Sequence, residues 1–144
     1  MKILAVDYGD ARTGLAISDN SEFLASPVGT IKEWNAGRLA EKIAAEAKKQ
    51  QAGEIIVGLP INMNGTKGPR AEKCEEFAEL LRSLTELPVK MWDERSTTVT
   101  AHQILNETNV RGKNRKAIVD TVAASVILEN YLDYRRKNKH KENN

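Results

Sequence analysis

Apolar and polar residues alternate along the first part of the chain, which predicts β-strands. The alternation begins at Lys2–Tyr8, resumes at Leu15–Ser18 and returns at Pro27–Ile31. Two glycines in the turn Gly9–Gly14 make a hairpin of the first two strands. The chain is therefore predicted to open with three antiparallel strands.

Beyond residue 34 the apolar residues recur at helical spacing, with short apolar strands between the helices. Asn35 is the candidate N-cap of the first helix, and Pro69 suits the first turn of the second. The expected order is helix, strand, helix, strand and two helices, over about 35–53, 54–57, 69–81, 87–92, 97–105 and 118–131. This pattern predicts an α/β domain, a mixed β-sheet in which antiparallel strands are followed by parallel additions, flanked by helices.

The length and the cysteine content narrow the class of protein. The 144 residues fit one domain, and no apolar run reaches the roughly 18 residues of a transmembrane helix. Asp7 and Asp10 interrupt the apolar stretch that a signal peptide needs. A single cysteine, Cys74, excludes an internal disulfide and a cysteine-cluster zinc site. We therefore expect a cytoplasmic protein without a membrane partner.

The charge is unevenly distributed along the chain. Of the 22 basic and 20 acidic residues, five and one lie in 135–144, which leaves 17 and 19 in residues 1–134, a net charge of −2. We therefore divide the chain into a domain, residues 1–134, and a basic C-terminal tail, residues 135–144. The tail is either a solvated, disordered end or a segment that attracts nucleic-acid phosphates, and charge alone does not decide between them.

Several acidic residues stand in apolar surroundings or at the end of a predicted strand. Asp7 lies on the apolar first strand, Asp93 and Glu94 follow the last predicted strand, and Asp120 lies inside the apolar last helix. Because side chains alternate along a strand, only one of Asp93 and Glu94 can point toward Asp7 without a local bend. Three convergent carboxylates without a suitable histidine pair favour Mg²⁺ or Mn²⁺.

A plainer interpretation of these acids is structural. Each one could cap a turn or pair with a nearby base such as Arg12, Arg95 or Lys116. That explanation is adequate for any single acid, and it is weaker for all three together.

Glycine-rich and basic loops favour the binding of phosphate groups. Glycines let the backbone approach an anion closely, and a cation with hydroxyls at a helix N-terminus is a ready anion site. The loop over 58–68 is longer than a compact fold needs, so its polar residues could also face a substrate. The residues expected to contact substrate are Gly9, Arg12, Gly14, Asn64, Arg95, Thr97, Thr98, Lys113 and Lys116.

Five segments of the sequence, taken in order, resemble the YqgF (RuvX) family. The resemblance covers essentially the whole chain, and the combination is specific although each segment alone is not. The segments are Asp7–Asp19, Val57–Pro60, Asn64–Gly65, Asp93–Thr98 and Lys116–Ala124.

The resemblance implies a ribonuclease H-like fold and a metal-dependent nuclease that binds nucleic acid. At the family's catalytic and metal-binding positions stand Asp7, Glu94 and Asp120, with Asp93 as the alternative at the middle position; one or two Mg²⁺ or Mn²⁺ ions are implied. Processing of the 5′ end of pre-16S ribosomal RNA, with association to the ribosome, is the first expectation. Resolution of Holliday junctions, a branched DNA, is the alternative.

The oligomeric state and two other function classes stay open at this point. A symmetric four-way junction calls for a homodimer with two active sites, whereas RNA processing is compatible with a monomer. A nucleotide-hydrolysing domain of the actin/Hsp70 type also opens with an Asp-x-Gly turn, but it normally pairs two such domains. A non-catalytic nucleic-acid-binding module would keep the fold without the chemistry.

Overall fold

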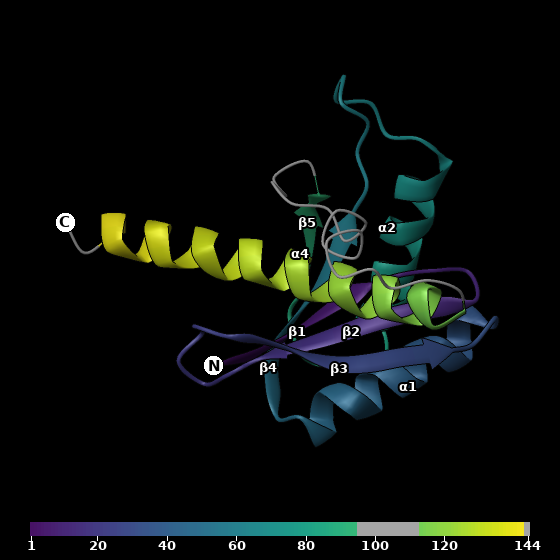
Figure 1. The fold of residues 1–144 in the computed structure, drawn as a ribbon, viewed down its shortest axis with the longest axis horizontal. Helices are drawn as coiled ribbons and strands as arrows, with labels where there is room; N and C mark the ends of the chain where they lie inside the picture. Colours follow the sequence, from purple (N-terminus) through teal and green to yellow (C-terminus); the bar gives the residue numbers. More distant parts are fainter. Residues whose placement is uncertain (95–112, 143–144) are drawn as a thin grey trace.

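The computed structural model describes residues 1–94 and 113–142, with side chains placed for 1–94 and 122–138 (Figure 1). The described strands form a five-stranded sheet in the order β3-β2-β1-β4-β5. They span Lys2–Asp7 (β1), Arg12–Ser18 (β2), Ala25–Lys32 (β3), Ala52–Leu59 (β4) and Val89–Asp93 (β5). The sheet is mixed: β1, β2 and β3 are antiparallel neighbours, whereas β4 is parallel to both β1 and β5. The predicted hairpin and the predicted parallel additions are confirmed.

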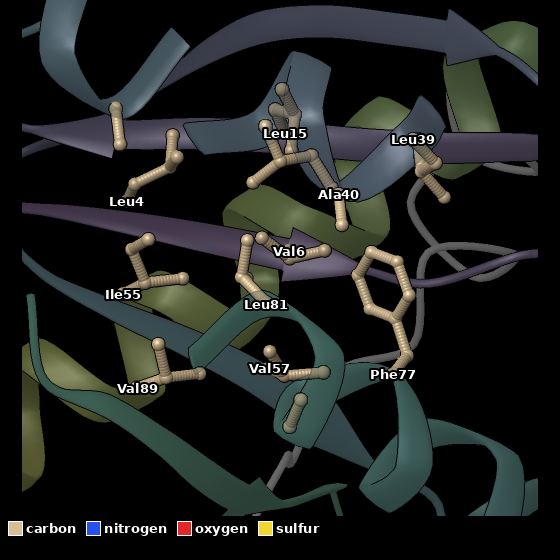
Figure 2. Packing of buried hydrophobic residues seen from close by; sticks show 13 residues of the cluster. Leu4, Val6, Leu15, Leu39, Ala40, Ile55, Val57, Phe77, Leu81 and Val89 are labelled. Atoms are coloured by element: carbon tan, nitrogen blue, oxygen red, sulfur yellow. The ribbon is translucent and has the colours of Figure 1, made fainter. Parts of the chain in front are cut away.

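Two helices cover one face of the sheet. They are α1 (Ala36–Lys49) and α2 (Pro69–Arg82). The Asn35 side chain accepts the backbone N–H of Arg38 at 2.9 Å, and Pro69 occupies the first turn of α2, so both predicted helix starts are confirmed. Figure 2 shows the core between these helices and the sheet, where Phe77 and Leu81 of α2 face Val6 and Val57.

The third described helix, α4 (Lys113–Glu142), crosses the other face of the sheet (Figure 1). Ala124, Leu128 and Leu132 belong to an apolar cluster with Ile3 and Ile56, all fully buried. The side chains of β1 and β4 therefore alternate between two cores, one under each layer of helices.

The start of α4 corrects one sequence prediction. We expected the last helix to begin near residue 118, but it begins at Lys113, so Lys113 and Lys116 stand in its first turns. Gly112 is the last glycine of the chain, and no proline follows it, so nothing in the local sequence delays the helix.

The far end of α4 continues through the basic segment to Glu142, and its C-terminal part extends beyond the sheet in Figure 1. Two of the first basic side chains in this segment bind the body of the protein. Arg135 pairs with Glu22 at 2.5 Å, and the guanidinium of Arg136 lies 4.9 Å from the centre of the Phe23 ring. Lys137 pairs with Asp133 within the helix at 2.9 Å. Residues 135–142 are thus helical rather than disordered.

A buried carboxylate joins this helix to the sheet. Glu54 of β4, predicted as part of an apolar strand, is only 2% exposed. It accepts the hydroxyl of Tyr131 at 2.6 Å and lies 3.1 Å from Nζ of Lys90 and 3.5 Å from the Arg135 guanidinium. Burial of a carboxylate is costly without such partners, so the cluster accounts for an acid inside the strand.

Within the residues that the structure describes, no helix combines the length and the apolar character that crossing a membrane requires.

Candidate active site

The carboxyl ends of the three parallel strands meet at one edge of the sheet. Asp7 is the last residue of β1, and Glu94 directly follows β5. In the strand register Val6 lies opposite Val57 and Trp92 lies opposite Gly58, so β4 lies between the two strands that carry the acids. The sheet topology therefore brings together two acids that are 87 residues apart in sequence.

Both acids line one pocket of about 190 Å³ at this edge. Asp93, the last residue of β5, pairs with Leu59 in the register and does not line the pocket. Strand alternation could not choose between the two neighbouring acids, and the structure turns Glu94 toward Asp7. The lining residues are Asp7, Tyr8, Gly9, Arg12, Gly58, Pro60, Arg70, Cys74 and Glu94.

The carboxylate of Glu94 rests against the backbone of Gly58. A Cβ atom at position 58 would lie 3.1 Å from Oε1 of Glu94 and 2.8 Å from Cδ1 of Ile127 in α4. Only a residue without a side chain leaves this space. Burial raises the pKa of Glu94, the charge of Arg70 opposes the rise and the charge of Asp93 adds to it.

The turn between β1 and β2 brings Arg12 into the same pocket. A Cβ atom at Gly9 would overlap the carbonyl oxygen of Arg12, so the tight turn requires glycine there. The N–H of Gly9 donates to Oγ1 of the fully buried Thr13 at 3.2 Å, which closes the turn. Gly14, which we expected beside substrate, lies instead within β2 opposite Asp7 and does not line the pocket.

Arg70, in the first turn of α2, also lines the pocket, and sequence reasoning missed it. Its guanidinium donates to Oδ1 of Asp10 at 3.2 Å and to the carbonyl oxygen of Tyr8. The Tyr8 ring in turn stacks on Phe77, with 4.4 Å between ring centres. One signal was present in the sequence: helix first turns favour acids, so an arginine there invites an explanation.

Cys74 forms an apolar part of the pocket wall. It is 2% exposed, and burial raises the pKa of its thiol to about 11. The thiol therefore stays protonated near neutral pH, and Cys74 packs as a small hydrophobic residue.

The long loop between β4 and α2 projects away from the sheet (Figure 1, teal) and is closed by its own polar side chains. Oδ1 of Asn64 accepts the hydroxyl of Thr66 at 2.6 Å and its backbone N–H at 3.1 Å. Asn62 donates to the Thr66 hydroxyl at 3.1 Å. Asn64 was expected to contact substrate, but it lies in this loop and does not line the pocket.

The remaining predicted site residues lie outside the described residues or in a part of α4 described by its backbone alone. Arg95, Thr97 and Thr98 lie outside the described residues, as does the predicted helix over 97–105. The backbone of Lys113, Lys116 and Asp120 belongs to α4, and their side chains lie outside the described set.

The donors of the pocket suit a hard divalent cation. Asp7 and Glu94 supply carboxylate oxygens, and the missing side chain at Gly58 leaves room beside Glu94. Among the side chains that the structure describes, no cluster of three or more acidic, histidine or cysteine residues could hold a metal ion. A third protein ligand would therefore come from outside that set, where the predicted candidate is Asp120.

Sequence comparison assigns most of the chain to a single family. The profile described as "RuvX: Holliday junction resolvase" matches residues 1–134. A protein of Halothermothrix orenii is 44% identical over 137 residues, which cover 95% of this chain and 98% of the relative. A protein of Ruminiclostridium cellulolyticum is 42% identical over 134 residues, 92% of this chain and 94% of the relative. Both relatives are named "Putative pre-16S rRNA nuclease".

Solved structures share the fold at much lower identity. Thermus thermophilus RuvC in complex with a Holliday junction substrate matches with a TM-score of 0.58 and 12% identity, over 93% of this chain and 96% of that one. The fowlpox virus Holliday junction resolvase matches with a TM-score of 0.51 and 18% identity, over 93% and 99% of the two chains. These likenesses confirm the predicted ribonuclease H-like sheet.

Proposed function

The chain belongs to the RuvX family, and from that membership and the pocket we propose that it is a nuclease that hydrolyses phosphodiester bonds. The observation that carries the proposal is that Asp7 and Glu94 line one pocket, at the edge of the sheet where the parallel strands end. Two carboxylates and two guanidiniums in so small a space suit a phosphodiester and a cation better than an apolar ligand.

The implied cation, Mg²⁺ or Mn²⁺, would be held by Asp7, Glu94 and Asp120. A bound divalent ion would lower the pKa of a coordinated water and stabilise negative charge on the phosphate. In sites with two such ions, the attacking and the leaving oxygen are both stabilised. Asp7 is anchored at the end of the central strand, and the missing side chain at Gly58 leaves the space that the Glu94 carboxylate occupies beside β4.

The basic residues would bind the nucleic-acid backbone. Arg12 lines the pocket and offers a planar fork of donors that matches phosphate oxygens. Arg95, Thr97, Thr98, Lys113 and Lys116 stay predictions for contacts farther along the strand. In this scheme the carboxylates gather the cation and the bases gather the phosphates.

The substrate that we propose first is the 5′ end of pre-16S ribosomal RNA, because the relatives at 42–44% identity carry that name. The alternative is a Holliday junction, which the description of the matching family favours. A four-way junction has two symmetric cleavage points, so that activity would require a homodimer. RNA processing would allow a monomer, associated with the ribosome or its precursors.

A direct comparison of substrates tests the proposal. We expect the wild-type protein with Mg²⁺ to cleave a pre-16S RNA fragment faster than a four-way DNA junction. Chelation of the cation and the variant Asp7→Asn should each abolish cleavage. Asp133→Asn, which changes a half-exposed acid on α4, is the matched control and should retain full activity. Full activity of Asp7→Asn would overturn the proposed site, and metal-dependent binding without cleavage would favour a non-catalytic module.

A further inference from the structure

Arg70 is held rigidly at the wall of the pocket. Two of its nitrogens donate hydrogen bonds to the β1–β2 turn, one to Asp10 and one to the Tyr8 carbonyl. Its Cζ atom also lies 5.2 Å from the centre of the Tyr8 ring. Because Tyr8 stacks on the buried Phe77, the guanidinium is braced against the hydrophobic core.

These contacts leave part of the guanidinium available to a ligand. A guanidinium has five N–H donors, and the contacts within the described residues engage one hydrogen on each of Nη1 and Nη2. The side chain is 40% exposed although it lines the pocket. An arginine that served only to close the turn would have no need to face the pocket.

Arg70 is one of the charged residues that line the pocket. The charged lining residues are two acids, Asp7 and Glu94, and two bases, Arg12 and Arg70. Arg70 therefore borders the same small space as the two acids, in which a phosphate would lie.

Lys73, one turn farther along α2, provides a natural comparison. Its Nζ lies 3.8 Å from the same Asp10 carboxylate, so it shares the ion pair of Arg70. It does not line the pocket that holds Asp7 and Glu94. Both bases thus pair with Asp10, and of the two only Arg70 lines the pocket that holds Asp7 and Glu94.

We propose that Arg70 contacts a non-bridging oxygen of the scissile phosphate and stabilises the negative charge that develops there during cleavage. The proposal rests on the nuclease function above and assigns a residue that the sequence motifs did not indicate. A donor fixed before substrate arrives costs no reorganisation in the reaction, so its contribution falls on the chemical step. A planar fork also differs from the ammonium of lysine, so Arg70→Lys should restore only part of the effect.

The test compares Arg70→Gln, Arg70→Lys and Lys73→Gln on the substrate that the wild-type protein cleaves. We expect Arg70→Gln to lower kcat by roughly 10²–10³-fold with little change in KM, the size typical of losing one oxyanion donor. Arg70→Lys should be intermediate, and Lys73→Gln should stay close to wild type. Thermal unfolding of each variant checks the fold, and Mn²⁺ binding checks that the cation site is intact.

A phosphorothioate substrate separates a direct contact from a structural role. Sulfur in place of the contacted oxygen should slow the wild-type protein, and this penalty should shrink in Arg70→Gln because the contact is already lost. Wild-type kcat in a folded Arg70→Gln, an unchanged sulfur penalty, or an equal loss in Lys73→Gln would each overturn the inference. Absence of cleavage by the wild-type protein would instead overturn the proposed function itself.

Discussion

The hydroxyl of Tyr131 donates a 2.6 Å hydrogen bond to Oε1 of Glu54, a carboxylate that is 2% exposed. Glu54 stands near the amino end of β4, whereas the pocket lies at the carboxyl end of the same strand. Helix α4 is therefore fastened to the sheet at the edge away from the candidate site. Changes at Tyr131 should act on stability without altering the groups of the pocket.

Tyr131→Phe keeps the ring but leaves the Glu54 carboxylate without its hydroxyl partner. We expect the free energy of unfolding to fall by about 1–3 kcal/mol, the cost of removing one partner from a buried charged group. Urea denaturation at pH 7 measures it. Tyr134→Phe is the control, because Tyr134 is 52% exposed and packs, like Tyr131, against the Trp92 ring. An equal loss in both variants would contradict a specific role for the bond.

The same bond predicts a loss of stability in alkali. Burial, together with the bond to Glu54 and its charge, raises the pKa of Tyr131 to about 12, against an ordinary value of 10.0. A raised pKa means that the stabilisation is complete below pH 10 and is lost as the pH rises through 12. The difference in unfolding free energy between wild type and Tyr131→Phe should therefore shrink over this range. A difference that stays constant up to pH 12 would contradict the assignment.

Gly58→Ala should disturb the pocket, because Gly58 is one of the residues that line it. The new methyl group would crowd Oε1 of Glu94 at 3.1 Å and Cδ1 of Ile127 at 2.8 Å. We expect lower nuclease activity and a loss of about 1–3 kcal/mol in stability, as for other overpacked sites. Gly68→Ala is the control, because its Cβ would meet only Nδ2 of Asn62 at an ordinary 3.7 Å. Equal activity of the two variants would show that the approach of Glu94 to β4 does not matter.

The two neighbouring acids after β5 should differ in their effect on activity. Changing a residue that only orients a metal ligand lowers activity by roughly 10–100-fold. Changing the ligand itself should cost at least as much, so we expect Glu94→Gln to lower the cleavage rate by at least about 100-fold. The cleavage rate of Asp93→Asn should stay within about fivefold of wild type. An interaction between partly exposed charges is worth up to about 1 kcal/mol, which corresponds to about a fivefold change in rate. Initial cleavage rates at saturating Mg²⁺ measure both. The reverse order would move the middle carboxylate to Asp93.

The last basic residues should contribute to nucleic-acid binding through charge alone. Removal of the whole segment from residue 135 would also break the Arg135 contacts with Glu22 and Glu54, so the chain is better ended after residue 138. If Lys139 and Lys141 touch phosphates, the slope of log affinity against log salt should fall by about 0.7–0.9 per contact. Filter binding at several salt concentrations measures the slope. An unchanged slope would restrict these residues to a role in solubility.

Local patterns predicted the order of the elements well and the contacts between them poorly. The strands and the starts of α1 and α2 followed from alternation and from Asn35 and Pro69, which act within their own turns. Glu54 was missed because its partners Tyr131 and Arg135 lie 77 and 81 residues away. Arg70 was missed for the same reason, since the turn that it binds is 60–62 residues earlier.

The candidate site was predicted where residue type was enough and left open where geometry was needed. Asp7 stood out as a charge on an apolar strand, and Arg12 as a cation between two glycines. The choice between Asp93 and Glu94 could not come from alternation, because Glu94 lies just past the strand end. The roles of Asp120, Arg95, Thr97 and Thr98 stay predictions.

The strand order gives the two carboxylates of the pocket unequal mechanical support. β1 is hydrogen-bonded on both sides, to β2 and β4, and its residues 3–6 are fully buried, so Asp7 ends the strand that is hardest to displace. β5 borders the described sheet and pairs with β4 alone, and Glu94 lies one residue beyond it. If the gap between the two acids adjusts when a cation binds, we therefore expect Glu94 to move more than Asp7.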